Sequence, residues 1–235
     1  MNLDDRMKEY ERVSSPRLLR RMPVIIRIDG RSFHTFTRKA VKPFDKKIIQ
    51  SMVESALDVS RDAQGFKMGY VQSDEASFLL TDYDSFETEA WFGNKLNKLV
   101  SISASIMTAS FNRSYFDGDF SLAQKLAHFD SRAFNVPENE VVNYFLGRAL
   151  DWKRNSLSML AQSKFSCKEL HGKDQSAMND MLHGIGVDWS DLDIQYRNGT
   201  FLVNTPDGVI TKSDIKPSFA DISALFNLIL GEKNV

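Results

Sequence analysis

Two acidic positions in the first third of the chain have the residue types and the spacing for metal chemistry. Asp29 follows a run of mostly β-branched residues that starts at Val24, and Asp74 directly precedes the apolar run Ala76–Leu80. Each aspartate is therefore predicted at the end of a short strand. If residues 66–71 form a neighbouring strand, the two carboxylates converge at one sheet edge. Carboxylate oxygens suit Mg²⁺, so phosphoryl or nucleotidyl transfer is the leading reaction class.

An ordinary turn explains each motif equally well when the residues are considered alone. Asp29-Gly30 is a common turn pair, and Ser73-Asp74-Glu75 is a common start of a turn or helix. Spacing by itself therefore leaves the metal site and the plain turns as open alternatives.

A resemblance to a known family favours the metal site. The segments IDGRSFH (residues 28–34) and QSDEASF (residues 72–78) resemble the two signature motifs of the tRNA-His guanylyltransferase family, whose members add nucleotides to the 5′ end of tRNA. The resemblance is specific from about Arg27 to Arg132 and thins beyond Met159. It implies a nucleotidyltransferase that uses ATP and GTP as substrates, tRNA as partner and Mg²⁺ as cofactor.

The resemblance also implies roles for the acidic residues. Metal binding is carried over to Asp29, Gly30 and Asp74, and catalysis to Asp29 and Asp74 with Glu75 in support. Glycine at position 30 lets the backbone carbonyl approach an ion closely. In a two-metal transfer, one ion activates the attacking hydroxyl and the other steadies the leaving pyrophosphate.

A set of residues around these motifs is predicted to bind the nucleotide. The turn after Asp29 presents successive backbone N–H groups that can hold phosphates. By resemblance, the nucleotide-binding residues are Gly30, Arg31, Ser32, Phe33, His34, Lys42, Ser73, Lys95, Lys98 and Arg132. The ordinary alternative places Phe33 in the core and the two lysines on a solvated helix face.

One stretch departs from the eukaryotic pattern of the family. Residues 151–159 (DWKRNSLSM) stand where those members carry His-Ile-Asn-Asn-Leu-Tyr-Asn, and Lys153 takes the place of the histidine. This resembles the Thg1-like branch of 3′-to-5′ polymerases, in which templated addition repairs 5′-truncated tRNAs. Lys153, Arg154 and Asn155 are predicted near the tRNA end. Lys173 and Arg197 are weaker candidates for tRNA phosphate contacts.

Composition places limits on the class of protein. With 235 residues and 42% apolar content, the chain can bury a substantial core. The net charge of −1 predicts no overall electrostatic attraction of the protein to nucleic acid. The single cysteine, Cys167, excludes an internal disulfide, and a cytoplasmic location is expected. No apolar run approaches the roughly 20 residues that span a bilayer, so no membrane partner is expected.

The order of the elements predicts an α+β fold. Residues 1–137 are predicted as a palm-type catalytic core, with an antiparallel sheet and two helices on one face, as in polymerases and cyclases. Residues 138–235 are predicted as a helical and hairpin extension packed on it. The start of the chain to residue 21 is predicted as an amphipathic helix followed by a break at Ser14-Ser15-Pro16 and a basic stretch. The other predicted helices cover residues 43–62, 86–111, 138–159, 163–165, 176–182 and 218–230, and the strands cover 24–28, 66–71, 76–80 and 127–134. A hairpin over 195–203 is predicted from Asn198-Gly199.

Three other functions remain as alternatives. Untemplated guanylyl addition to histidine tRNA is the first, since the family is named for it. A nucleotide cyclase shares the palm and the two aspartates. A non-catalytic RNA-binding palm would be expected to lack a metal carboxylate, and here both are present. Family members form tetramers, so the resemblance also implies a homotetramer.

Overall fold

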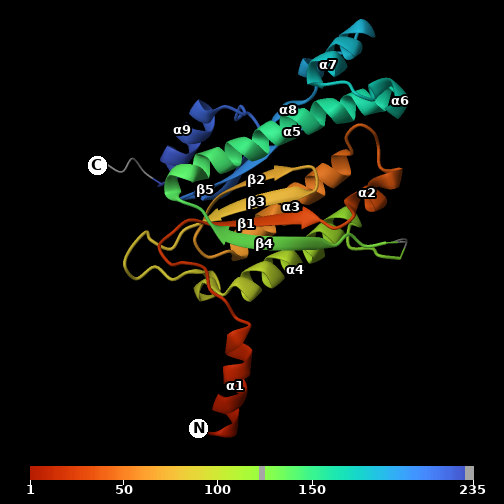
Figure 1. Cartoon of the computed structure of the whole chain (residues 1–235). Helices are drawn as coiled ribbons and strands as arrows, with labels where there is room; N and C mark the ends of the chain where they lie inside the picture. Colours follow the sequence, from red (N-terminus) through yellow and green to blue (C-terminus); the bar gives the residue numbers. More distant parts are fainter. Residues whose placement is uncertain (122–124, 231–235) are drawn as a thin grey trace.

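An antiparallel sheet forms the centre of the molecule (Figure 1). The computed structural model describes residues 1–121 and 125–230. Across these residues the sheet has six strands in the order β4-β1-β3-β2-β5-β6. The strands are β1 (Val24–Gly30), β2 (Phe66–Gln72), β3 (Glu75–Leu80), β4 (Phe129–Asn135), β5 (Thr200–Thr205) and β6 (Gly208–Lys212).

Helices cover both faces of this sheet. The α-helices are α1 (Leu3–Val13), α2 (Phe33–Phe36), α3 (Lys46–Asp62), α4 (Leu96–Tyr115), α5 (Val141–Lys164), α6 (Cys167–Leu170), α7 (Gln175–Gly184), α8 (Ile194–Asn198) and α9 (Phe219–Leu230). Short 3₁₀ helices are η1 (Thr37–Lys39), η2 (Trp91–Asn94), η3 (Glu138–Glu140) and η4 (Trp189–Asp191). The predicted α+β arrangement, with α3 and α4 on one face, is confirmed, and α5 and α9 from the second half cover the other face.

Strand β1 shows why the two faces differ in chemistry. Successive side chains of a strand point to opposite faces. Ile26 and Ile28 pack in the core under α3 and α4, whereas Ile25 packs in the core under α5. Arg27 and Asp29 share the face of Ile25, so the α5 face carries charged groups near the end of β1.

The predicted hairpin at Asn198-Gly199 is wrong. Asn198 ends α8, and Gly199, with φ of +72°, is the residue that caps it. The hairpin lies later, between β5 and β6, and β5 pairs with β2 of the first half. An Asn-Gly pair favours left-handed backbone, which serves a helix end as well as a hairpin turn. The second half therefore extends the same sheet.

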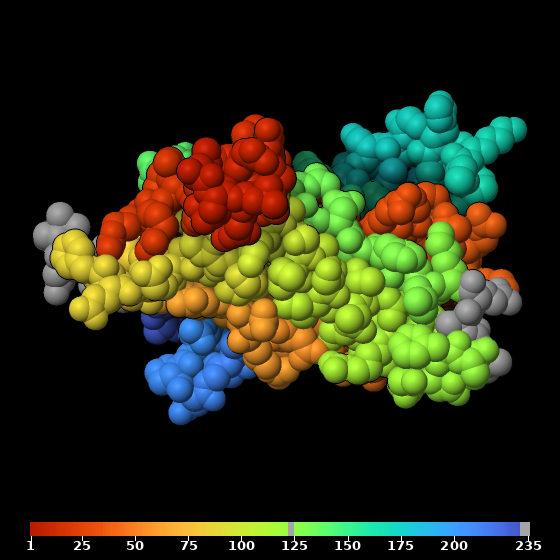
Figure 2. All heavy atoms as spheres, turned by 90° about the horizontal axis from the view of Figure 1, so that it is seen from below, coloured from red at the N-terminus to blue at the C-terminus, as the bar shows by residue number. Residues whose placement is uncertain are grey.

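Several predicted helix boundaries also shift. The helix expected over 86–111 starts only at Leu96, because Phe92, Gly93 and Asn94 all have positive φ and interrupt it. The short helix expected at 163–165 is the end of α5. The first helix ends at Val13, directly before the predicted break at Ser14-Ser15-Pro16. Helix α1 buries none of its residues and projects from the body (Figures 1 and 2). In the described part of the chain, no helix has the length and apolar character to cross a membrane.

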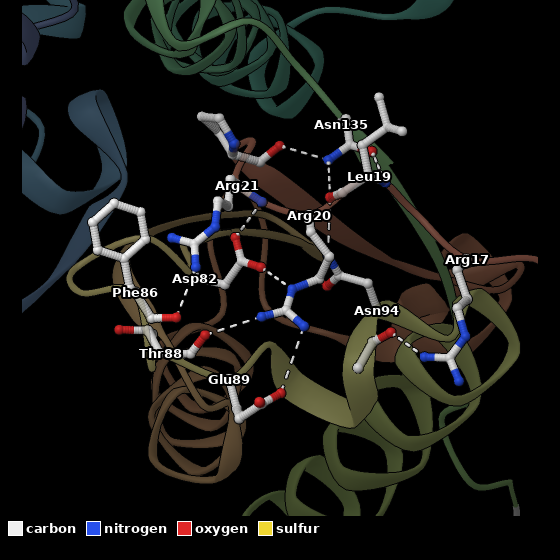
Figure 3. A network of polar contacts seen from close by, with 12 residues as sticks. Arg17, Leu19, Arg20, Arg21, Asp82, Phe86, Thr88, Glu89, Asn94 and Asn135 are labelled. Atoms are coloured by element: carbon white, nitrogen blue, oxygen red, sulfur yellow. Dashed lines mark hydrogen bonds and ion pairs between the residues drawn. The ribbon is translucent and has the colours of Figure 1, made fainter.

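An arginine-rich segment after α1 is tied to the β1-start end of the sheet (Figure 3). The Arg20 guanidinium forms an ion pair with Asp82 and donates to the Thr88 carbonyl at 3.0 Å. The backbone N–H of Arg21 donates to the same Asp82 carboxylate at 2.8 Å. Asp82 is thereby buried with its charge matched.

Candidate active site

The two predicted aspartates meet at the opposite end of the sheet. Asp29, near the end of β1, lies opposite Glu75 of β3 on one side and Asp130 of β4 on the other. The backbone N–H of Gly30 donates to the carbonyl of Asp74 at 3.0 Å. The convergence predicted from the sequence is therefore confirmed.

The space around position 30 has no room for a side chain, so glycine is required there. A Cβ atom added there would lie 2.8 Å from Oδ2 of Asp74 and 2.6 Å from Cδ2 of Phe33. Any side chain would therefore push the Asp74 carboxylate or the Phe33 ring out of place. The glycine lets the backbone and the carboxylate occupy the same small region.

The Asp74 carboxyl lies where negative charge is unfavourable. Burial is the main cause that raises its pKa, and the charge of Asp29 raises it further, although the Ser73 hydroxyl donates to it at 3.0 Å. A cation at this position would relieve both effects. Among residues 1–121 and 125–230, no three His, Cys, Asp or Glu side chains gather in a metal-binding cluster. Two carboxylates and the Gly30 carbonyl fit Mg²⁺, which binds few protein ligands and takes phosphates and water as the rest.

Glu75 has a different environment from the two aspartates. Its carboxylate is buried between two arginines, with Arg27 Nε at 3.0 Å and Arg148 Nη1 at 3.3 Å. Arg27 also lies 3.4 Å from Asp29. Glu75 therefore links β1 to α5 through arginines. The sequence analysis missed both arginines, although the charge of Arg27 inside an apolar run was a signal.

A cavity of about 390 Å³ opens beside Gly30 and Asp74. Of the predicted nucleotide-binding residues, it is lined by Gly30, Ser32, Phe33, His34, Lys42 and Ser73. Its apolar walls come from Phe44, Ile48, Ile49, Trp152 and Met159, which the sequence analysis did not select. Phe33 is also packed in the core, so its interpretation as a core residue is confirmed, and nucleotide binding by it stays a prediction. The cavity thus combines the carboxylates of Asp74 and Asp45, a lysine and an apolar wall, whereas Asp29 is not among the described residues that line it.

Comparisons with known proteins identify the family. A model described as Thg1, tRNAHis guanylyltransferase, matches residues 4–137. This chain belongs to the Thg1 family. The structure of a bacterial tRNA(His) guanylyltransferase (Thg1)-like protein in complex with ATP is 37% identical with a TM-score of 0.89, over 97% of this chain and 98% of that one. The GTP complex of a bacterial Thg1-like protein is 33% identical with a TM-score of 0.81, over 97% and 99%.

A curated relative agrees with this assignment. The probable tRNA(His) guanylyltransferase of Dictyostelium discoideum is 29% identical over 80% of this chain and 78% of its own length. The resemblance found in the two sequence motifs is therefore confirmed, and so is the palm-like α+β fold.

Four residues predicted to bind nucleotide in this Thg1-family chain lie outside the cavity lining. The side chain of Arg31 is exposed, and Arg132 forms an exposed ion pair with Asp130 at 3.1 Å. Lys95 and Lys98 lie at the start of α4, where Lys98 Nζ is 5.5 Å from the centre of the Phe92 ring. The preceding residue, Asn94, donates a hydrogen bond to the Leu19 carbonyl at the end of the sheet where β1 starts. The start of α4 therefore lies at that end, and the structure does not bring these lysines to the cavity. Their role in nucleotide binding stays a prediction.

Of the five residues predicted to contact tRNA, four are exposed on the second half, and Arg197 is half-buried. Lys153, Arg154 and Asn155 are exposed on α5, next to the cavity-lining Trp152. Lys173 is exposed after α6. Lys153 and Arg197 lie 5.8 Å and 5.9 Å from the centre of the Trp189 ring. Contact with tRNA remains a prediction for all five.

Proposed function

We propose that this protein is a Mg²⁺-dependent nucleotidyltransferase that extends the 5′ end of tRNA in the 3′-to-5′ direction and repairs 5′-truncated tRNAs on a template. One observation carries the proposal: the cavity of about 390 Å³ at Gly30 and Asp74 lies in a chain that aligns over 97% of its length with a bacterial Thg1-like protein in complex with ATP. A nucleotide in this cavity would have its phosphates beside Asp74, which lines it, with Asp29 close to Asp74.

Different residues of the site are suited to bind the metal ion, the base and the phosphates. Asp29, Asp74 and the Gly30 carbonyl would hold Mg²⁺, which when bound stabilises negative charge on phosphates and helps a hydroxyl to ionise. Trp152 and Phe44 provide an apolar wall for a base or ribose. Lys42 offers positive charge to the phosphates.

The reaction must begin with activation of the tRNA end. A 5′-monophosphate has no good leaving group, so its oxygen first attacks the α-phosphorus of ATP and pyrophosphate leaves. The 3′-hydroxyl of the incoming nucleotide then attacks the 5′ phosphorus of the tRNA, and AMP leaves with the electrons of the broken P–O bond. A 5′-triphosphate would make the first step unnecessary.

Template dependence is inferred from the altered stretch on α5. Its side chains that line the cavity, Trp152 and Met159, are apolar, whereas Lys153, Arg154 and Asn155 are exposed. Apolar walls accept any base but read none by hydrogen bonding. Pairing with the opposite strand would then select the nucleotide, because a correct pair gains stacking and hydrogen bonds that a mismatch lacks.

The decisive experiment uses two 5′-truncated, 5′-monophosphorylated tRNAs that differ in one base. The unpaired base that faces the missing nucleotide is cytidine in one and adenosine in the other, and GTP is the nucleotide for addition. Faster addition opposite cytidine is expected. Equal rates, or addition only opposite adenosine in histidine tRNA, would favour untemplated guanylyl addition. Pyrophosphate release from ATP without any tRNA would instead indicate a cyclase.

A homotetramer and a cytoplasmic location belong to the same proposal. Light scattering of the untagged protein over a range of concentrations tests the tetramer, and cell fractionation tests the location.

A further inference from the structure

A second concave surface lies behind the wall of the nucleotide cavity. This groove, of about 560 Å³, is lined by three basic side chains, Arg38, Lys39 and Lys125, and three aromatic ones, Phe36, Tyr115 and Phe116. Among the residues that the structure describes, no acidic side chain lines it. We refer to these six residues as the basic groove.

The positive charges of the basic groove are uncompensated. Arg38, Lys39 and Lys125 are all exposed, and none forms an ion pair within the described ranges 1–121 and 125–230. Of the carboxylates that follow Phe116 in the chain, Asp117 pairs with Lys47 at 2.6 Å, and Asp119 accepts a hydrogen bond from the Ser121 N–H at 2.9 Å. In a chain with net charge −1, three free cations in one groove favour a polyanion locally.

The rings of the basic groove continue a chain of aromatic contacts from the core to the surface. The ring centres of Phe36 and Tyr115 are 5.1 Å apart, and those of Tyr115 and Phe116 are also 5.1 Å apart. Phe120 follows at 5.8 Å from Phe116 and is 46% exposed. Aromatic platforms next to a basic track are how proteins bind single-stranded nucleic acid, by stacking bases and pairing with phosphates.

The position of the basic groove relates it to the nucleotide cavity. The segment formed by α2 and η1 separates the two, because Ser32, His34 and Thr37 line the cavity while Phe36 and Arg38 line the groove. In Figure 2, the orange atoms of this segment lie at the same end of the molecule as the yellow-green atoms that follow α4. A nucleic-acid strand in the groove would therefore be separated from the proposed site of nucleotide addition only by α2 and η1.

We propose that the basic groove binds the unpaired 3′ strand of the tRNA acceptor end, next to the 5′ end that is being extended. This inference rests on the proposed function, which requires the templating strand to lie close to the cavity. The unpaired 3′ nucleotides supply both the free bases and the phosphates that the groove fits.

The test combines a change in the protein with a change in the RNA. The groove variant is Arg38→Gln, Lys39→Gln and Lys125→Gln, and the control variant is Lys8→Gln, Arg61→Gln and Lys216→Gln, which are also exposed and change the net charge equally. Dissociation constants are measured for a 5′-truncated tRNA and for the same tRNA without its unpaired 3′ nucleotides. The wild type and the control are expected to lose affinity on trimming, whereas the groove variant binds both tRNAs equally weakly.

The salt dependence gives a second readout. Loss of three contacts to single-strand phosphates should make the slope of log K against log salt less negative by about 2, which corresponds to roughly 100-fold in affinity at about 0.1 M salt. ATP affinity should be unchanged in the groove variant, because no groove residue lines the cavity. Equal competition by polyglutamate and by a single-stranded RNA of the same charge would overturn the proposal in favour of a general anion surface.

Failure of this inference can be distinguished from failure of the proposed function. If the wild type extends tRNA and the groove variant behaves as the control does, the groove assignment is wrong and the proposed function stands. If the wild type extends no tRNA but binds a short single-stranded RNA through the groove, the proposed function is wrong and the groove assignment stands. Absence of any RNA binding would refute both.

Discussion

The two ends of the central sheet handle buried negative charge in opposite ways. At the end where β1 starts, the Asp82 carboxylate is paired with Arg20 and accepts from the backbone of Arg21 (Figure 3). At the end where β1 finishes, Asp74 lies near a second carboxylate, Asp29, and its pKa is raised. At the first end, arginine matches the buried charge and holds the N-terminal segment. At the second end, Asp74 forms no ion pair within the described residues, although Asp29 lies 3.4 Å from Arg27. We call these the matched end and the unmatched end.

This difference separates a carboxylate that stabilises the fold from carboxylates that we propose bind a metal ion. A buried charge with its partners in place stabilises the arrangement around it, and loss of one partner is costly. A half-buried carboxylate beside a like charge is unfavourable until a cation arrives. Glu75 lies between these cases, because it is adjacent to Asp74 but is matched by Arg27 and Arg148.

The largest expected effect is on activity, at the unmatched end. Asp29→Asn and Asp74→Asn should each lower nucleotide addition by about 1,000-fold or more, since the lost stabilisation of phosphate charge is about 4 kcal/mol. Asp130→Asn is the matched control, because Asp130 faces Asp29 across the β1–β4 pair but is exposed. The measurement is the single-turnover rate in saturating Mg²⁺. Full activity in either aspartate variant would rule out the metal assignment.

A smaller loss of activity is expected when the Asp74 carboxylate is displaced by a neighbouring side chain than when its charge is removed. Gly30→Ala places a Cβ within 2.8 Å of Oδ2 of Asp74, so the carboxylate must shift. Activity should fall by roughly 10- to 100-fold, in the range seen when the support of a metal ligand is disturbed. The dependence of the rate on Mg²⁺ concentration should move to higher values. Gly147→Ala, where no atom lies within 4 Å of the added Cβ, is the control and should be silent.

At the matched end, the expected effect is on stability. Asp82→Asn should lower the free energy of unfolding by about 2 kcal/mol, less than for a fully buried pair because Arg20 is partly exposed. Urea denaturation measures this, and activity per folded molecule should not change. The pair of Asp84 with Lys67, in which the Asp84 carboxylate is exposed, offers the comparison, and Asp84→Asn should cost less than about 1 kcal/mol. Equal losses would remove the distinction between the two pairs.

The raised pKa of Asp74 gives a pH-dependent prediction. In the folded state Asp74 keeps its proton to higher pH than in the unfolded state, so ionisation above its ordinary pKa of 3.8 destabilises the fold. Stability of the wild type relative to Asp74→Asn should therefore fall as pH rises through the window above 3.8, by at most about 1.4 kcal/mol per pH unit. Thermal unfolding without metal measures this. Saturating Mg²⁺ should cancel the difference, and a pH-independent difference would contradict the assigned cause.

The smallest effect is expected for the two lysines at the start of α4. The double variant Lys95→Gln, Lys98→Gln tests whether these lysines bind nucleotide. If ATP binds only in the cavity of a single chain, its dissociation constant should change by less than about twofold, because both lysines lie at the matched end. A charge-assisted phosphate contact is worth about 1.5 to 3 kcal/mol, so Lys42→Gln in the cavity should weaken ATP by roughly tenfold or more. Calorimetry distinguishes the two variants. A large effect of the double variant would mean that a second copy or another state brings these lysines to the nucleotide.

The sequence by itself determined the local elements and the two acidic motifs. The β-branched run before Asp29, the apolar run after Asp74 and the periodic helices at 46–62 and 141–164 were all predicted close to their observed bounds. These features follow from short-range preferences, in which each residue is influenced mainly by neighbours within one turn or one pleat. The signature motifs likewise lie within single short segments, so the family could be inferred from them.

Only the tertiary structure decided which distant segments share a site. Trp152 enters the cavity from α5, more than a hundred positions after Gly30, and Arg148 reaches Glu75 from the same helix. The Asn198-Gly199 pair could serve a hairpin or a helix cap, and the packing of Gly199 against Tyr70 accompanies the cap. Lys95 and Lys98 could face either end of the sheet until the direction of α4 was known. Such choices depend on the packing of whole elements against one another, which no local pattern of residues encodes.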